Sequence, residues 1–317
     1  MASSPLRLLC CEVAFSHRDA DDKQAFSWVS SGYAVSALLG PSLGGVSYGK
    51  ELSWPQIMKL SWTLPWLLIA LTYSMCLLVV LFLLPETAFL PDRDLQRSPV
   101  SQATTNLFTD RGFLLVMAMA WGHSYVFTGW ETTYPTLAEL DADETGEDWT
   151  TTQVGVNFLV GGVALVTYNV LLYTRLASSV SVRRLWVWSW ALPLVVLVSF
   201  PRLVTRLISQ GASADGVAIL VLNYGSQIVI SVLLGSGFTS IQLIVNEHVA
   251  TLPDHRRQLA SANGVLAALQ ALARAVSPTV TGSLFSCGFS VSFLSRSTAF
   301  DHLAVVGVVT GVLCALL

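Results

Sequence analysis

Long apolar runs separated by short polar connections make up most of this 317-residue chain. A helix needs about 20 consecutive apolar residues to cross the hydrocarbon core of a bilayer. Eight segments reach or approach that length, and each predicts a transmembrane helix: 27–47, 61–84, 112–134, 152–174, 184–202, 216–245, 258–285 and 302–317. The pattern therefore predicts an all-α membrane protein with about eight transmembrane helices.

The most polar connection divides these helices into two unequal groups. It combines mixed charge with Pro91 and Pro99, a composition typical of a linker. We therefore expect four regions: a cytoplasmic N-terminal segment at 1–26, two helices at 27–89, a central cytoplasmic linker at 90–111 and a six-helix bundle at 112–317.

The distribution of Lys and Arg over the connections predicts the orientation in the membrane, because cytoplasmic connections carry the excess of positive charge. Eleven of these residues fall on one side: Arg7, Arg18, Lys23, Arg93, Arg97, Arg111, Arg175, Arg183, Arg184, Arg256 and Arg257. Five fall on the other side: Lys50, Lys59, Arg202, Arg206 and Arg296. The even number of spans then predicts that both termini are cytoplasmic.

Composition agrees with a location in the plasma membrane or an organelle membrane such as that of the vacuole. The chain is 53% hydrophobic and 12% charged, with a mean hydropathy of +0.61. A soluble domain carries about a quarter charged residues. The net charge is -3 and the Lys and Arg residues form no dense basic stripe, so we expect no nucleic-acid partner.

Motifs of enzymes and metal sites are missing from the sequence. There is no P-loop GxxxxGK[ST] pattern and no HExxH zinc motif. The cysteines form no CxxC or Cys/His ligand spacing; they are Cys10, Cys11, Cys76, Cys287 and Cys314. We therefore expect no catalytic residue, no bound metal and no cofactor.

Small residues recur every four positions in the first predicted span, although glycine and proline disfavour helices. Such a face lets another helix approach closely in lipid, and proline bends the helix. The face is either a static packing seam or a bend that seals an interface between two halves. Its residues are Gly32, Ser36, Gly40, Pro41, Gly44 and Gly45.

Glu131 is an ionisable residue inside a predicted span, where charge is costly and therefore marks a functional candidate. Four residues near it in the sequence are expected to surround it: Tyr125, Trp130, Tyr134 and Pro135. In a partly dry cavity this carboxyl would exchange protons near neutral pH or pair with a cationic substrate. The alternative is that Glu131 lies at the membrane interface, already in contact with water.

Four polar residues form one stripe on the seventh predicted span: Asn263, Gln270, Arg274 and Ser277. A polar stripe in a membrane helix is expected to face a cavity or another helix rather than lipid. Arg274 would then bind an organic anion or neutralise a carboxylate such as Glu131. Alternatively, its side chain extends to the membrane surface.

Other polar residues are better explained by packing or solvation. Asn223 and Gln227 can hydrogen-bond a ligand, but polar residues more commonly hold membrane helices together. His123 is alone within its span, which favours a buried packing histidine over a proton relay. The acidic connection at 139–148 contains no basic residue and predicts a solvated loop, with a cation-gathering vestibule as the weaker alternative.

Three stretches in this order resemble the major facilitator superfamily of secondary transporters. The stretch "GYAVSALLGPSLGG" at 32–45 is similar to the glycine-proline signature in the fifth helix of its antiporter branches. The stretch "LFLLPET" at 81–87 resembles the end of the sixth helix, and 245–286 resembles the tenth and eleventh helices. The order of polar residues is similar to the zinc-induced-facilitator-like group, related to tetracycline and multidrug efflux proteins: Arg256, Arg257, Asn263, Gly264, Arg274 and Pro278.

This resemblance implies a proton-coupled antiporter that exports small organic molecules or metal chelates by alternating access between two six-helix halves. The family also has an acidic residue near the position that Glu131 occupies, so the resemblance implies a functional role for Glu131. The family has twelve helices, so the resemblance places the first predicted span at helix five and leaves helices one to four without a counterpart. The alternative is therefore a truncated, transport-incompetent membrane protein. The sequence leaves the oligomeric state open.

Overall fold

A computed structural model describes residues 67–72, 74–75, 78, 107–141, 146–213, 216–252, 255–290 and 297–316. The first predicted span and its small-residue face, with Gly32, Ser36, Gly40, Pro41, Gly44 and Gly45, lie outside the described residues. Of the second predicted span, 67–72, 74–75 and 78 are described, and they are helical.

The other six predicted spans are confirmed as helices. Their bounds are α4 (Arg111–Ala138), α5 (Thr151–Tyr168), α7 (Val182–Ser209), α8 (Val217–Ala250), α9 (His255–Ser290) and α10 (Thr298–Ala315). After α5, one wide π-helical turn, η4 (Asn169–Tyr173), leads directly into α6 (Thr174–Ser179). The all-α fold class expected from the apolar runs is therefore correct.

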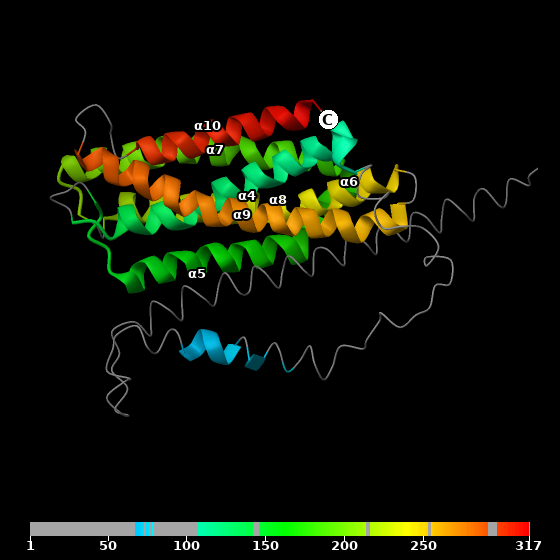
Figure 1. Ribbon diagram of the computed structural model, residues 1–317. Coiled ribbons are helices and arrows are strands. Elements are labelled where there is room, and N and C mark those ends of the chain that lie inside the picture. The colour runs from blue at the N-terminus through cyan, green and yellow to red at the C-terminus, as the bar shows by residue number, and fades with distance from the viewer. Residues whose placement is uncertain are drawn as a thin grey trace, which may run out of the picture.

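The helices lie side by side along their lengths and form one bundle (Figure 1). α4 is at its centre, packed against α8, α9 and α10. α5 packs against α8, and α7 packs against α8 and α10. Short connections make neighbours in sequence antiparallel, so one end of the bundle carries the described residues of the α4–α5 loop (139–141 and 146–150) and the other carries the start of α4.

By length and composition, four described segments are suited to cross a membrane: Thr151–Ser179, Val182–Ser209, Val217–Ala250 and Gln258–Gly288. Their outward surfaces are apolar. On α7, for example, Trp188, Leu192 and Val195 are each about 60% exposed at helical spacing. Large apolar side chains directed away from the protein are expected where lipid is the solvent.

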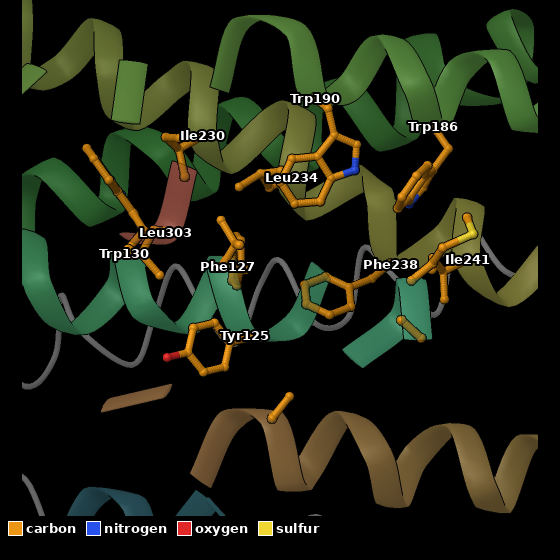
Figure 2. Close-up of a cluster of buried hydrophobic side chains, with 14 of the residues drawn as sticks. Tyr125, Phe127, Trp130, Trp186, Trp190, Ile230, Leu234, Phe238, Ile241 and Leu303 are labelled. Atoms are coloured by element: carbon orange, nitrogen blue, oxygen red, sulfur yellow. The ribbon is translucent and has the colours of Figure 1, made fainter. Parts of the chain in front are cut away.

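The centre of the bundle is an aromatic cluster between α4, α7 and α8 (Figure 2). Trp130 of α4 and Trp186 of α7 are fully buried, and Phe238 of α8 packs edge-on against Phe127. Such rings bury large apolar areas and hold the helices in a defined register. The polar residues of α4 are therefore surrounded by closely packed apolar side chains.

Candidate functional site

Polar contacts join α4 and α8 along most of their shared length, and we call this series the α4–α8 seam. From one end of the bundle to the other, its pairs are Asp110 with His248, His123 with the Leu234 carbonyl, Trp130 with Gln227, and Tyr134 with Asn223. Residue numbers rise on α4 as they fall on α8, because the two helices are antiparallel. The seam therefore places a series of polar groups in the interior of the bundle.

Four residues singled out in the sequence meet in two neighbouring pairs of this seam. Trp130 Nε1 donates to Gln227 Oε1 at 3.0 Å, and the Tyr134 hydroxyl donates to Asn223 Oδ1 at 2.8 Å. Each helix supplies residues four positions apart, which places them on one face. The rings of Trp130 and Tyr134 stack with centroids 5.3 Å apart. Their polar atoms therefore bond between helices, as the helix-holding interpretation of Asn223 and Gln227 predicts.

Glu131 lies in a small pocket between α4, α5 and α8. The residues of α4 that line it are Phe127, Trp130 and Glu131; those of α5 are Phe158, Gly162 and Leu165; those of α8 are Gln227, Ile230 and Ser231. The pocket therefore joins one carboxylate to an aromatic wall and an amide. The indole that bonds Gln227 also lines this pocket, so the pocket and the seam share a wall.

A glycine on α5 makes the close approach to α8 possible. A methyl group at Gly161 would lie 2.4 Å from Ser231 Oγ, too close for any side chain. Ser231 accepts a hydrogen bond from Gln227 Nε2 at 3.1 Å, so Gly161 lies over the polar part of α8. Close backbone approach at small residues is a general means of packing membrane helices.

Arg274 on α9 faces the same region of the bundle. Its guanidinium carbon lies 5.1 Å from the centroid of the Phe238 ring, a cation–π contact. Arg274 is within electrostatic range of both Glu131 and His123. This places Arg274 against the interior aromatic cluster of the bundle. That it binds an organic anion or neutralises a carboxylate such as Glu131 stays a prediction.

The rest of the polar stripe on α9 faces different neighbours. Asn263 donates to Asn246 Oδ1 at 3.4 Å and to the Leu259 carbonyl, whereas Gln270 is half-buried and does not line the Glu131 pocket. Ser277 donates to the Tyr125 carbonyl at 2.6 Å. A stripe that runs along several turns of a helix contacts different neighbours at its two ends. Residues on one face of α9 therefore need not belong to one binding site.

Tyr125 lies apart from the Glu131 pocket. Its hydroxyl is 2.9 Å from Nε2 of His302 on α10, and its ring stacks on Trp121. In Figure 2 the Tyr125 ring projects from α4 away from the tryptophans of α7. The expectation that Tyr125 surrounds Glu131 is therefore wrong, because residues six positions apart on a helix project in widely different directions.

His123 has the packing role that the sequence favoured. It is fully buried, its Nε2 donates to the Leu234 carbonyl at 2.8 Å, and its ring packs edge-on against Phe238 and Trp190. Gly237 makes room for it, since a methyl group there would lie 2.2 Å from the imidazole. The imidazole thus ties α4 to α8.

The prediction of a solvated acidic loop is wrong for Glu147. This side chain is fully buried, and its Oε2 accepts a hydrogen bond from Asn223 Nδ2 at 2.5 Å. Burial raises the pKa of Glu147 to about 7, against the opposing effect of the Asn223 hydrogen bond. Local signals could have indicated this fold: Gly146 precedes Glu147, and Trp149 is an apolar residue in an acidic run.

The ion pair at the other end of the seam was also missed in the sequence. Asp110 caps the start of α4 by accepting a hydrogen bond from Phe113 N, and its Oδ1 lies 2.6 Å from His248 Nε2. Partial burial opposes ionisation, but the hydrogen bonds from Phe113 and His248 lower the pKa of Asp110. An aspartate immediately before an apolar run is a helix-start signal; its histidine partner is visible only in three dimensions.

In the described part of the chain, no group of three or more His, Cys, Asp or Glu side chains is placed to hold a metal ion. The described cysteines are Cys287, which is exposed, and Cys314, which is buried.

Comparison with known proteins gives the chain a family. Residues 17–278 match the family model of the Major Facilitator Superfamily, which covers most of the sequence. A search of curated proteins found no match. Helices of membrane-spanning length and a polar seam inside an apolar bundle agree with this assignment. The chain belongs to the Major Facilitator Superfamily: it is an integral multi-pass membrane protein of a family of transporters that carry small solutes and are not enzymes.

Proposed function

We propose that the protein is a secondary active transporter that exports small organic molecules or metal chelates from the cytosol in exchange for protons. The observation that carries this proposal is the Glu131 pocket, with an aromatic wall, the Gln227 amide and the positive charge of Arg274 within electrostatic range. A carboxylate inside a membrane bundle is costly unless it has a task. Protonation makes the Glu131 carboxylate neutral. Binding and release of the proton can therefore be coupled to movement of the bundle.

The residues would divide the work as follows. Glu131 would bind the coupling proton or a cationic group, while Trp130 supplies aromatic contact in the pocket. Tyr134 and Asn223 bond each other in the next pair of the seam, and they would hold the aromatic wall of the pocket in place. Arg274, with Asn263 and Gln270 farther along α9, would set the polarity of the solute path.

The order of Arg256, Arg257, Asn263, Gly264, Arg274 and Pro278 supports the zinc-induced-facilitator-like and multidrug efflux group as the subgroup. The excess of Lys and Arg supports cytoplasmic termini, in the plasma membrane or an organelle membrane. The α4–α5 loop would then face the outside or the lumen, and the Asp110–His248 pair the cytosol. Residues 112–317 would form one half that moves against a half containing 27–89, across the linker 90–111.

The proposal is tested by proton flux in proteoliposomes that contain the full chain. A pH gradient is imposed, and organic cations such as ethidium, organic anions and metal chelates are added in turn while a pH-sensitive dye reports the gradient. At least one solute should dissipate the gradient in the wild-type protein and not in Glu131→Gln.

Glu139→Gln is the matched control, because Glu139 is an exposed carboxylate just beyond the same helix. It should behave as the wild type. Unchanged solute-dependent proton flux in Glu131→Gln would remove Glu131 from the coupling role, and no proton flux with any solute class would overturn proton antiport.

A further inference from the structure

The described residues of the α4–α5 loop, 139–141 and 146–150, fold back onto the bundle. Three backbone hydrogen bonds close it: Gly146 N donates to the Asp141 carbonyl, Asp148 N to the Leu140 carbonyl and Trp149 N to the Ala138 carbonyl. Trp149 is 3% exposed, and its ring lies 6.3 Å from that of Tyr224 on α8. Asp148 adopts a positive φ of 54°, and both of its neighbours, Glu147 and Trp149, have buried side chains.

A directional chain of hydrogen bonds ends at the Glu147 carboxyl. Asn157 Nδ2 on α5 donates to the Tyr134 hydroxyl, which donates to Asn223 Oδ1. Asn223 Nδ2 in turn donates to Glu147 Oε2. Every donor in the chain therefore points toward the carboxyl, and loop residue Glu147 is connected to α4, α5 and α8 through it.

The carboxyl is poorly compensated as an anion. Within the described residues, its Oε1 is buried and has no hydrogen-bond partner, so the single donor is a neutral amide. An ionised carboxylate accepts up to about four hydrogen bonds and is costly to bury with fewer. A neutral carboxyl needs much less compensation, so the geometry suits the protonated form.

The surrounding charges do not stabilise an anion either. The titratable groups that α4 and α8 bring to this end are Tyr134 and Tyr224, and α5 begins with the uncharged Thr151–Thr152–Gln153. The loop itself adds further acids, Glu139, Asp141 and Asp148. No interaction on Glu147 in the described part of the chain comes from a Lys, Arg or His.

We propose that Glu147 is a proton-operated latch for residues 146–150 of the α4–α5 connection. With a proton on its carboxyl, Glu147 stays buried and fastens these residues against α4, α5 and α8. When the proton leaves to bulk water, the carboxylate favours solvent, and residues 146–150 separate from the bundle. No other reactant is required, and the latch does not depend on which solute or ion the protein carries.

The direction of the pH effect follows from the two states. Burial raises the pKa of Glu147 to about 7, whereas an exposed glutamate has a pKa of about 4.3. The closed loop therefore has its full stability below about pH 4.3 and loses it as the pH rises toward 7. The opening constant should increase by about tenfold per pH unit within this window and level off above it.

The test is hydrogen–deuterium exchange of the full chain in lipid nanodiscs, read by mass spectrometry on peptides that contain Gly146–Trp149. After correction for the chemical exchange rate at each pH, protection of the 146–149 amides should fall about tenfold or more from pH 5.5 to 7. It should change little from pH 7.5 to 8.5. Peptides from the buried middle of α8 should show no such window.

Two variants separate the latch from a general pH effect. Glu147→Gln keeps the shape and cannot ionise, so its loop should stay protected across the whole pH range. Glu139→Gln removes an exposed acid of the same loop and should behave as the wild type. Wild-type protection that is independent of pH, or the same pH dependence in Glu147→Gln, would overturn the proposal.

Discussion

Two carboxylates, Asp110 and Glu147, contact helix α8 at opposite ends of the α4–α8 seam. Asp110 is part-exposed, accepts a hydrogen bond from a helix N-terminus and pairs with His248 at 2.6 Å. Glu147 is fully buried and meets one neutral amide of Asn223. The pKa of Asp110 is lowered and that of Glu147 is raised. The same chemical group therefore stabilises one end as an anion and the other as a neutral acid, because partners and burial differ.

The two ends respond to pH with opposite sign. A lowered pKa in the folded state contributes stability at neutral pH that is lost as the pH falls through that pKa. A raised pKa contributes stability at low pH that is lost as the pH rises toward it. The Asp110 end should therefore weaken in acid, and the Glu147 end should weaken toward neutral pH.

The largest effect is expected from Asn223→Leu. This change removes the donor to Glu147 and the acceptor of Tyr134, and leaves both groups buried. Loss of a buried hydrogen-bond partner costs about 1–3 kcal/mol per group, more when the group is charged. Thermal unfolding in detergent at pH 5.5, where the Glu147 end is closed, should show a lower midpoint for Asn223→Leu.

Asn263→Leu is the matched control, because Asn263 is half-exposed and bonds a carbonyl of its own helix and, at the longer distance of 3.4 Å, Asn246. It should change the midpoint little. Equal losses in the two variants would contradict the view that the Glu147 end depends on its single amide donor.

A smaller effect is expected from substitutions of Asp110, and two of them separate its two partners. Asp110→Ala removes the helix cap and the His248 pair together, for a cost of about 1 kcal/mol in the free energy of unfolding. Asp110→Asn keeps a capping side chain, so its cost is the part-exposed ion pair alone, about 0.2–1 kcal/mol. In the wild type, the midpoint of thermal unfolding should fall as the pH is lowered from 7 to 3 (the acid limb of the profile). In both variants this fall should be smaller.

That acid limb should remain steep in Glu147→Gln. If Glu147→Gln flattened the acid limb below pH 4 and Asp110→Asn did not, the assignment of opposite pH responses to the two ends would be reversed.

The smallest net effect is expected from Gly112→Ala. A methyl group at Gly112 would lie 2.3 Å from Cε1 of His248, so the imidazole must shift away from Asp110. Alanine itself favours a helix over glycine by about 1 kcal/mol, and this gain offsets part of the loss. Gly282→Ala is the control, since nothing lies within 4 Å of its new methyl group.

Thermal unfolding should show no gain, or a loss, for Gly112→Ala and a small gain for Gly282→Ala. An equal gain in both variants would mean that the contact between α4 and α8 at Gly112 is loose.

Much of the fold could be predicted because spans of membrane length leave a simple signal. The predicted span 184–202 lies inside α7, and 258–285 lies inside α9. The errors are at the ends: α4 was predicted to stop at 134, but it continues through Pro135 to Ala138. Proline lacks the N–H that would bond the carbonyl four residues earlier, but its own carbonyl still accepts a hydrogen bond from Glu139 N, and the helix continues past it.

The candidate site was predictable only within each helix. Trp130 and Tyr134, or Asn223 and Gln227, are four positions apart, and this spacing alone places each pair on one face. That these two faces meet is a property of the packing of α4 against α8. Tyr125 shows the limit, because its nearness to Glu131 in sequence did not bring it to the pocket.

The sequence by itself determined which segments are helices and that they belong in a membrane, since these properties depend on local runs of apolar residues. Only the tertiary structure decided which of its carboxylates are buried and which charge each of them prefers. Glu147 and Glu139 belong to the same acidic run, yet one is buried and the other exposed. Burial and hydrogen-bond partners come from residues distant in the chain, here Asn223 on α8, and they set the preferred charge of the group.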